Sequence, residues 1–255
     1  MAETAKEGEY IYCIIKTGES LALGPMGIGG RGDAVYAISN GGLAAVVSNS
    51  PMTKYSVSRE NMLSHERVIE KVMCEHTVLP VRFCTIAHDE ETVRKVLRKE
   101  HDRFDVLLQR MHGKKELGLK VMFKKEAIYS DILKNYKDIR NLKQKISELP
   151  AARTYYERSR IGQMVEQALQ SEKETVKQTI LDALSPLAVD RRLNAPYGEL
   201  MIVSAAFLVE VSREAEFDRA VDELAETLTE KTKFKYVGTV PPFNFVNLTI
   251  ELNEA

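Results

Sequence analysis

Residues Asp33–Ser48 read DAVYAISNGGLAAVVS, and this stretch indicates that the fold contains an antiparallel sheet. Two β-type runs, 33–39 and 43–48, flank the tripeptide Asn40-Gly41-Gly42. Asn and Gly tolerate the positive φ angles that a tight hairpin turn requires. The two runs are therefore predicted to form a β-hairpin. An earlier apolar run, EYIYCIIK at Glu9–Lys16, predicts a buried strand in the same domain.

Helical patterns follow this β-rich start. Ser58 is a plausible N-cap for a helix whose apolar residues recur at three- and four-residue spacing as far as Met73. Val78–Ile86 is predicted to be a strand, with Pro80 at a strand start, edge or bulge because proline lacks an amide proton. Asp89–Met111 is predicted to be a second helix. Residues 1–113 are therefore expected to form an N-terminal α+β domain.

The rest of the chain, residues 114–255, is expected to form a second α+β domain. Its predicted elements are, in order, a strand at Leu117–Phe123, helical stretches at 131–149 and 151–184 separated by Pro150, a strand or strand pair at Glu199–Val211, a helix at Glu214–Thr229, and a strand at Phe234–Leu252 interrupted by Pro241-Pro242. This order predicts a ferredoxin-like βαββαβ domain in which a long helical arm, about 131–184, enlarges the first helix.

Composition excludes several classes of protein. The 255 residues carry 36 Lys and Arg against 37 Asp and Glu, which argues against a broad nucleic-acid-binding surface. There is no run of 18 or more apolar residues, so no membrane-spanning segment is expected. The first nine residues are polar and more acidic than basic, unlike a signal or transit peptide. Three cysteines without paired spacing indicate a reducing compartment, and we expect a cytoplasmic protein.

Charge is nevertheless unevenly distributed. Residues 114–192 hold 17 basic and 11 acidic side chains, a net charge of +6, whereas residues 193–255 hold 5 and 11, a net charge of −6. This asymmetry is consistent with attraction between the two segments, with a bipolar surface for a partner, or simply with solvated faces of amphipathic helices.

The sequence Gly27-Ile28-Gly29-Gly30-Arg31-Gly32 matches the G-x-G-x-x-G pattern of dinucleotide-binding proteins. That pattern binds pyrophosphate only when a strand runs directly into the glycines and a helix begins after them. Here the preceding predicted strand ends about ten residues earlier, and a predicted strand follows. A surface loop is therefore favoured. A small-molecule or nucleotide-binding enzyme that uses Gly24–Gly32 is the alternative function.

Other candidate chemistry is weak. Cys74, His76, Cys84 and His88 are residue types that bind zinc, but they lack the close ligand pair of a zinc knuckle. Buried cysteines of this kind are common core residues. No Ser/His/Asp set, carboxylate pair or phosphate clamp stands out. We therefore expect no enzyme activity, no metal and no cofactor.

The C-terminal block Gly238–Phe245 reads GTVPPFNF. After its two prolines, Val246, Leu248, Ile250 and Leu252 alternate toward one predicted face, and Phe243 and Phe245 fall on the other. The two rings are predicted either to pack under the helices of the second domain or to form an aromatic ledge that binds a hydrophobic partner.

Four blocks of the chain together resemble the gas vesicle protein F/L family. They are Glu9–Lys16; His65-x₂-Val68-Ile69-x₂-Val72-Met73-x₂-His76-x-Val78-Leu79-Pro80-Val81-Arg82-Phe83; Ala206-Phe207-Leu208-Val209; and Gly238-x₂-Pro241-Pro242-x₂-Phe245. The resemblance covers nearly the whole chain. It favours the F-like branch of the family, and the L-like branch stays open as the alternative. The family pattern continues from Arg82-Phe83 into a glycine, where this chain has Cys84.

The resemblance implies a minor accessory or structural component of gas vesicles, the protein-walled flotation organelles, located at the vesicle within the cytoplasm. It implies two domains, no catalysis, and as partners the small hydrophobic shell protein and other accessory proteins, rather than nucleic acid or a membrane. Our candidate contact residues are Pro80, Arg82, Phe83, Pro241, Pro242, Phe243 and Phe245. The competing interpretation is that these prolines end strands and these rings lie in the core. A scaffold that oligomerises through the arm at 131–184 is a further alternative.

Overall fold

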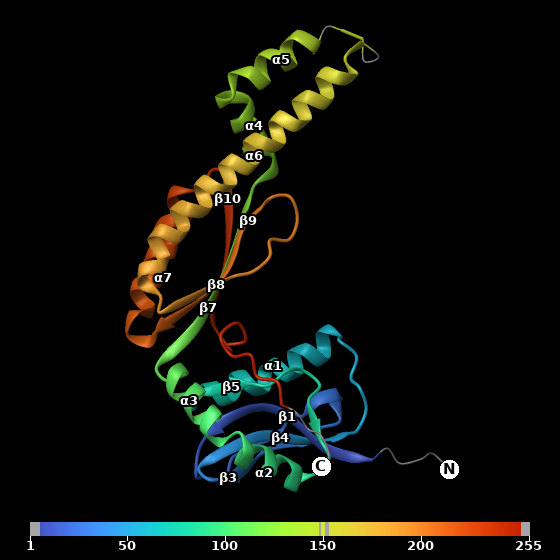
Figure 1. Cartoon of the computed structure of the whole chain (residues 1–255), viewed down its shortest axis with the longest axis vertical. Helices are drawn as coiled ribbons and strands as arrows, with labels where there is room; N and C mark the ends of the chain where they lie inside the picture. The colour runs from blue at the N-terminus through green and yellow to red at the C-terminus, as the bar shows by residue number, and fades with distance from the viewer. Residues whose placement is uncertain (1–5, 148, 151–152, 251–255) are drawn as a thin grey trace, which may run out of the picture. The chain divides into compact units, whose positions relative to one another are not determined.

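The computed structural model describes residues 6–147, 149–150 and 153–250. The chain forms two compact units (Figure 1), the first made by residues of 1–116 and 239–255 and the second by residues 117–238. The predicted boundary after residue 113 placed the C-terminal segment in the second domain, whereas that segment groups with the first unit. One reason is that Asn244 donates its backbone N–H to the carboxylate of Glu116 at 3.0 Å, which holds the returning segment on the first unit.

The first unit contains one antiparallel sheet. Its strands are β1 (Glu7–Lys16), β2 (Ala22–Pro25), β3 (Ala34–Asn40), β4 (Leu43–Pro51), β5 (Val78–Pro80) and β6 (Ile86–Ala87), in the order β2-β3-β4-β1-β5 with β6 also paired to β1. The predicted hairpin is confirmed, because β3 and β4 pair antiparallel from Val35 with Ser48 to Asn40 with Leu43. The two loop residues, Gly41 and Gly42, carry the positive φ angles of 61° and 82°.

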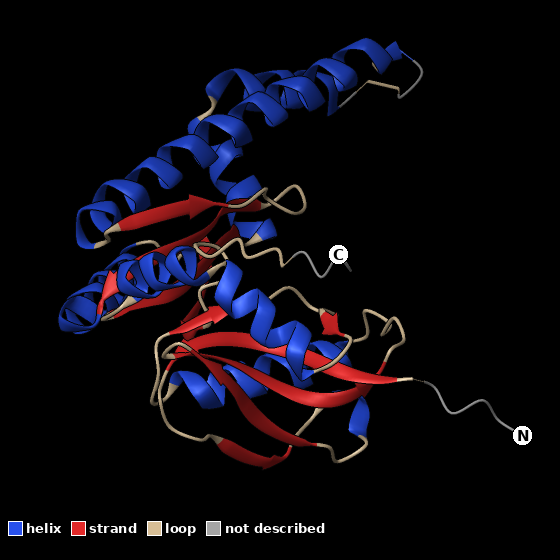
Figure 2. Cartoon of the chain, turned by 60° about the horizontal axis from the view of Figure 1, so that its bottom comes forward, coloured by secondary structure: helices blue, strands red, loops and turns tan. Residues whose placement is uncertain are grey.

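Both faces of this sheet are covered, since the eight central residues of β1 are all buried. Helix α1 (Arg59–Met73) places Val68, Ile69 and Val72 against one face, and the Ser58 hydroxyl caps it by accepting the N–H of Asn61. Helices α2 (Glu90–Lys99) and α3 (His101–Met111) also pack on the sheet (Figure 2), outside the cluster that α1 forms. The predicted single helix 89–111 is therefore two helices, which meet at Glu100.

Two segments of the first unit differ from what the sequence predicts. The predicted strand Val78–Ile86 is interrupted between β5 and β6, where Cys84 adopts a left-handed backbone with φ of 65°. The glycine-rich segment Gly27–Gly32, for which a surface loop is favoured, contains a short 3₁₀ turn, η1 (Ile28–Gly30), and the side chain of Ile28 is buried.

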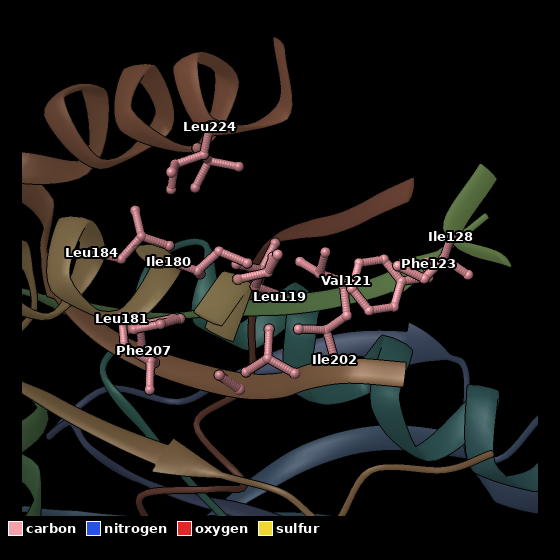
Figure 3. Packing of buried hydrophobic residues seen from close by; sticks show 14 of the residues in the cluster. Leu119, Val121, Phe123, Ile128, Ile180, Leu181, Leu184, Ile202, Phe207 and Leu224 are labelled. Carbon is pink, nitrogen blue, oxygen red and sulfur yellow. The ribbon is translucent and has the colours of Figure 1, made fainter. Parts of the chain in front are cut away.

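The second unit is built on a four-stranded sheet. Its elements are β7 (Lys114–Phe123), α4 (Lys125–Asn135), α5 (Lys137–Ser147), α6 (Tyr155–Leu184), η3 (Ser185–Leu187), β8 (Asp190–Leu193), β9 (Met201–Glu210), η4 (Val211–Arg213), α7 (Glu214–Thr227) and β10 (Thr232–Val240). The strand order is β10-β7-β9-β8. Figure 3 shows Ile180, Leu181 and Leu184 of α6 packing toward side chains of β7 and β9.

The arm and the last strand of this unit differ from the predictions. The first helical stretch, predicted at 131–149, is α4 and α5, which meet at Tyr136, and it begins earlier. Strand β8 was not predicted, because its sequence DRRL lacks β-type apolar residues. The predicted strand Phe234–Leu252 ends at Val240, directly before Pro241-Pro242, where the missing amide protons end the ladder. The predicted core position of Leu252 lies outside the described residues.

Candidate functional site

Two blocks that are far apart in the sequence meet at His65 in the first unit. His65 lies on α1 and its side chain is 1% exposed. The ring centroid of Phe83 lies 5.8 Å from that of His65 with the rings edge to face, and the centroid of Phe243 lies 6.3 Å away at a tilt of 33°. His65 therefore supports both the segment after β5 and the C-terminal segment.

Hydrogen bonds hold the His65 ring in one orientation. Its Nε2 lies 3.2 Å from the carbonyl oxygen of Val81, and its Nδ1 lies 3.0 Å from the hydroxyl of Tyr10. A carbonyl only accepts, so Nε2 carries the proton and Nδ1 accepts from Tyr10. Burial lowers the pKa of His65 to about 4, and the ring is therefore neutral at neutral pH. Burial also raises the pKa of Tyr10, so that its hydroxyl stays protonated and able to donate.

The same Tyr10 hydroxyl fixes the turn at Cys84. It accepts the backbone N–H of Cys84 at 2.9 Å, and the Sγ of Cys84 in turn accepts the backbone N–H of Tyr55 at 3.3 Å. A positive φ is unfavourable for a residue with a side chain. These two hydrogen bonds help to stabilise the turn at Cys84.

The glycine-rich loop contacts two tyrosines of the first unit, Tyr12 and Tyr55. The hydroxyl of Tyr12 accepts the N–H of Ile28 at 2.7 Å and is bonded to Ser48 Oγ at 2.9 Å. A Cβ on Gly29 would lie 2.9 Å from the ring of Tyr55, so glycine permits this close approach. Strand β3 follows the glycines, and no α-helix begins there to direct amides at a phosphate. The geometry therefore does not favour the nucleotide-binding alternative.

The structure separates the seven candidate contact residues by exposure. Four of them are buried: Pro80, Pro241, Pro242 and Phe245. Phe83 is partly buried, whereas Arg82 is exposed and Phe243 has 43% of its surface exposed. The predicted pairing of both C-terminal phenylalanines on one face is therefore wrong, because the backbone after Pro241 turns instead of continuing as a strand.

A hollow of about 500 Å³ adjoins the Phe83 side of this region. It is lined by Met52, Thr53, Lys54, Phe83, Cys84, Thr85, Ile86 and Ile250. Its lining combines apolar side chains with a lysine and two threonines. It therefore suits a partner side chain that has both an apolar and a polar part.

A buried carboxylate holds the Pro-Pro turn. Glu116 accepts the backbone N–H of Asn244 at 3.0 Å and its side-chain amide at 2.5 Å. Burial raises the pKa of Glu116, while the two hydrogen bonds from Asn244 act in the opposite direction. No motif in the sequence points to this pair. Its signal is an acidic residue, Glu116, directly before the apolar run Leu117–Phe123 within β7.

The candidate zinc residues do not come together. Cys74 is exposed and bonds to the carbonyl of Glu70, Cys84 contacts Tyr55, and His88 lies 3.5 Å from the Nζ of Lys6. Within the described part of the chain, no group of three or more His, Cys, Asp or Glu side chains is arranged to hold a metal ion. The same residues include no helix that is both long and apolar enough to cross a bilayer.

A sequence model of the family described as "Gas vesicle synthesis protein GvpL/GvpF" matches residues 8–247. The chain belongs to the GvpL/GvpF family. Gas vesicle protein F of Nostoc sp. (strain PCC 7120 / SAG 25.82 / UTEX 2576) is 30% identical over 219 residues, covering 84% of this chain and 88% of that protein. Gas vesicle protein L of Streptomyces sp. (strain CB03234) is 28% identical over 126 residues, or 44% of this chain and 47% of that protein.

Solved structures of family members share the fold. The crystal structure of the gas vesicle protein GvpF from Anabaena sp. PCC7120 matches with a TM-score of 0.82 and 27% identity, over 95% of this chain and 99% of that one. GvpF from Microcystis aeruginosa matches with a TM-score of 0.74 at 23% identity, over 94% and 99% of the two chains. This chain is thus a gas vesicle-related α+β protein with antiparallel sheets, and the family expected from its motifs is confirmed.

Proposed function

We propose that this member of the GvpL/GvpF family is a non-catalytic accessory protein that contacts the small hydrophobic gas vesicle shell protein during assembly. The observation that carries the proposal is the exposed ring of Phe243, which rests on the buried ring of His65. A protein that assembles a hydrophobic shell needs an apolar surface of this kind, on which a subunit is held before it polymerises.

In this proposal, the seven candidate residues divide into a contact group and a support group. Arg82, Phe83 and Phe243 form the contact group, because each is at least partly exposed. Aromatic residues and arginine are enriched at the centres of protein interfaces. The buried Pro80, Pro241, Pro242 and Phe245 form the support group and hold the contact group in place.

A prearranged contact group favours affinity. Tyr10 and Val81 hold His65 through hydrogen bonds, and Glu116 holds Asn244 next to Phe243. Less side-chain and loop freedom is then lost on binding. The hollow beside Phe83 is a second point of contact, which would receive a side chain of the shell protein.

Two further parts of the proposal concern the second unit and the location. The chain order β7, helices, β8, β9, α7, β10 and the sheet order β10-β7-β9-β8 support a ferredoxin-like domain with the arm as an enlarged first helix. The family names support a location at gas vesicles, within the cytoplasm, with other gas vesicle accessory proteins as additional partners.

The test is capture of a co-expressed gas vesicle shell protein by the full chain over a salt titration. We expect capture that does not depend on salt, and we expect Phe243→Ser to weaken it at least about tenfold with little change in melting temperature. The matched control is Val106→Ser on α3, which removes a side chain that is 63% exposed elsewhere in the first unit and should leave capture intact.

Two results would contradict this proposal. If a few hundred millimolar salt abolishes capture, the contact is made by the charged segments 114–192 and 193–255 instead, because salt screens exposed charges. Equal capture by wild type and by the double variant Phe243→Ser, Arg82→Glu would remove the contact group from the interface.

A further inference from the structure

Strand β8 forms an open edge of the second sheet. It is the last strand in the order β10-β7-β9-β8 and pairs antiparallel with β9. The N–H of Asn194 donates to the carbonyl of Ser204 at 2.8 Å, and paired residues of an antiparallel ladder alternate between bonded and non-bonded positions. The N–H and C=O of Leu193, one residue earlier, therefore point away from β9 toward the open edge.

The border of this edge is apolar. Val189, directly before β8, and Leu193, its last residue, are 55% and 49% exposed, and Tyr197 in the following loop is 89% exposed. Natural edge strands are commonly kept short and charged, which prevents unwanted pairing. Strand β8 is short and carries two arginines, but its apolar flanks are features of a strand that receives a partner.

A cavity lies at the Leu193 end of the strand. Its volume is about 140 Å³, and it is lined by Lys177, Leu193, Asn194, Pro196, Ile202, Val203 and Ser204. A cavity of about 150 Å³ accepts a molecule the size of benzene, so this one accommodates a leucine or phenylalanine side chain. Peptides that add a strand to a sheet gain affinity from main-chain hydrogen bonds and specificity from pockets of this kind.

The charges on β8 indicate which kind of segment can pair with this strand. Arg192 pairs with Asp190 at 3.4 Å, whereas the guanidinium of Arg191 donates to the neutral hydroxyl of Ser185. Antiparallel pairing of β8 with β8 of a second copy would bring arginines of the two chains together, and like charges across a ladder are unfavourable. An acidic segment would instead face Arg191 and Arg192 with complementary charge.

We propose that β8 is a docking edge for an extended, acidic segment of a partner protein, which adds a strand beside β8 and inserts an apolar side chain into the cavity at Leu193. This site uses residues of the second unit only. It is independent of the contact group around Phe243, so either proposal can fail without the other.

The probe is an acetylated and amidated peptide of sequence TEVELTVE, titrated into the isotope-labelled full chain. We expect the backbone amide of Leu193 and its neighbours in β8 to shift in NMR spectra. A peptide with lysine in place of every glutamate, and a peptide N-methylated at alternate residues so that it cannot complete the ladder, should each bind at least about tenfold more weakly.

Two variants at Leu193 distinguish a loss of pairing at the edge of the sheet from a loss of folding. Leu193→Pro removes an N–H that points to the open edge, and proline is tolerated at that position of an edge strand. It should weaken binding of the peptide about tenfold relative to the matched variant Leu193→Thr, which retains the N–H, with similar circular dichroism for the two.

Three outcomes would overturn the proposal. They are binding of the N-methylated peptide as strong as that of its parent, chemical shift changes that map away from β8, and absence of binding at millimolar peptide. Self-association of the chain that Leu193→Pro abolishes would identify a second copy as the occupant and would equally overturn it.

Discussion

At the scale of single residues, Cys84 is in an unusual conformation. It has a φ of 65°, and it is the non-glycine residue with positive φ among the described residues. A left-handed conformation costs a residue with a Cβ roughly 1–2 kcal/mol relative to glycine. Its Sγ offsets part of this cost by accepting the N–H of Tyr55.

We predict that Cys84→Gly is more stable than Cys84→Ala by about 1 kcal/mol, because both variants lose the sulfur but only glycine relieves the backbone. The free energies of unfolding of the two variants, measured by urea denaturation, check this. An alanine variant as stable as the glycine variant would mean that the turn imposes no left-handed conformation in solution.

His65 makes stability depend on pH. In the unfolded chain a histidine takes up a proton near pH 6.5, whereas burial lowers the pKa of folded His65 to about 4. Between these values the unfolded state binds more protons, so the free energy of unfolding falls as pH decreases from about 6.5 to about 4 and then levels off. The loss is about 3 kcal/mol.

The buried carboxylates Glu9 and Glu116 act in the opposite direction, since burial raises the pKa of each. The measurement is therefore the difference in the free energy of unfolding between wild type and His65→Gln as a function of pH. We expect the variant to lose less stability than wild type between pH 7 and pH 4. Parallel curves for the two proteins would show that His65 is not kept neutral by the fold.

At the scale of elements, helices α4, α5 and α6 form the arm of the second unit. Local patterns predicted helices in this part of the chain, but the break at Tyr136 was not predicted. The Tyr136 hydroxyl donates to Glu172 of α6 at 3.2 Å, and a contact of this kind between helices leaves no periodic signal in the sequence. Pro150 was expected to separate the helices, and it does lie between α5 and α6.

Gly162 lies inside α6, and apart from its chain neighbours and the backbone of the helix itself a Cβ added there would meet no atom within 4 Å. Glycine in a helix interior is less favourable than alanine by about 1 kcal/mol. We predict that Gly162→Ala slows hydrogen exchange of α6 amides and raises the melting temperature of the second unit. An unchanged exchange rate around residue 162 would contradict this prediction.

At the scale of the whole molecule, the chain returns to the first unit after completing the second. Phe245, Val246 and Leu248 are buried there, with exposed fractions of 6%, 3% and 1%. The C-terminal segment therefore contributes to the stability of a unit whose other residues lie more than a hundred positions earlier in the sequence.

We predict that Phe245→Ala destabilises the first unit by roughly 3–5 kcal/mol, the usual loss when a buried phenylalanine is removed. Phe243→Ala, which removes a half-exposed ring of the same size, should cost much less. Hydrogen exchange of amides in β1 and α1 measures both effects. Equal losses for the two variants would contradict the difference in burial.

Local signals predict the hairpin at 34–51, the capped helix α1 and the family, because turn glycines, a Ser N-cap and short motifs act through neighbouring residues. The exposure of Phe243, the burial of Phe245, and the contacts of Phe83 and Phe243 with His65 depend on tertiary contacts instead. The reason is that proline ends a strand locally, whereas the direction in which the chain then turns depends on distant partners such as Glu116.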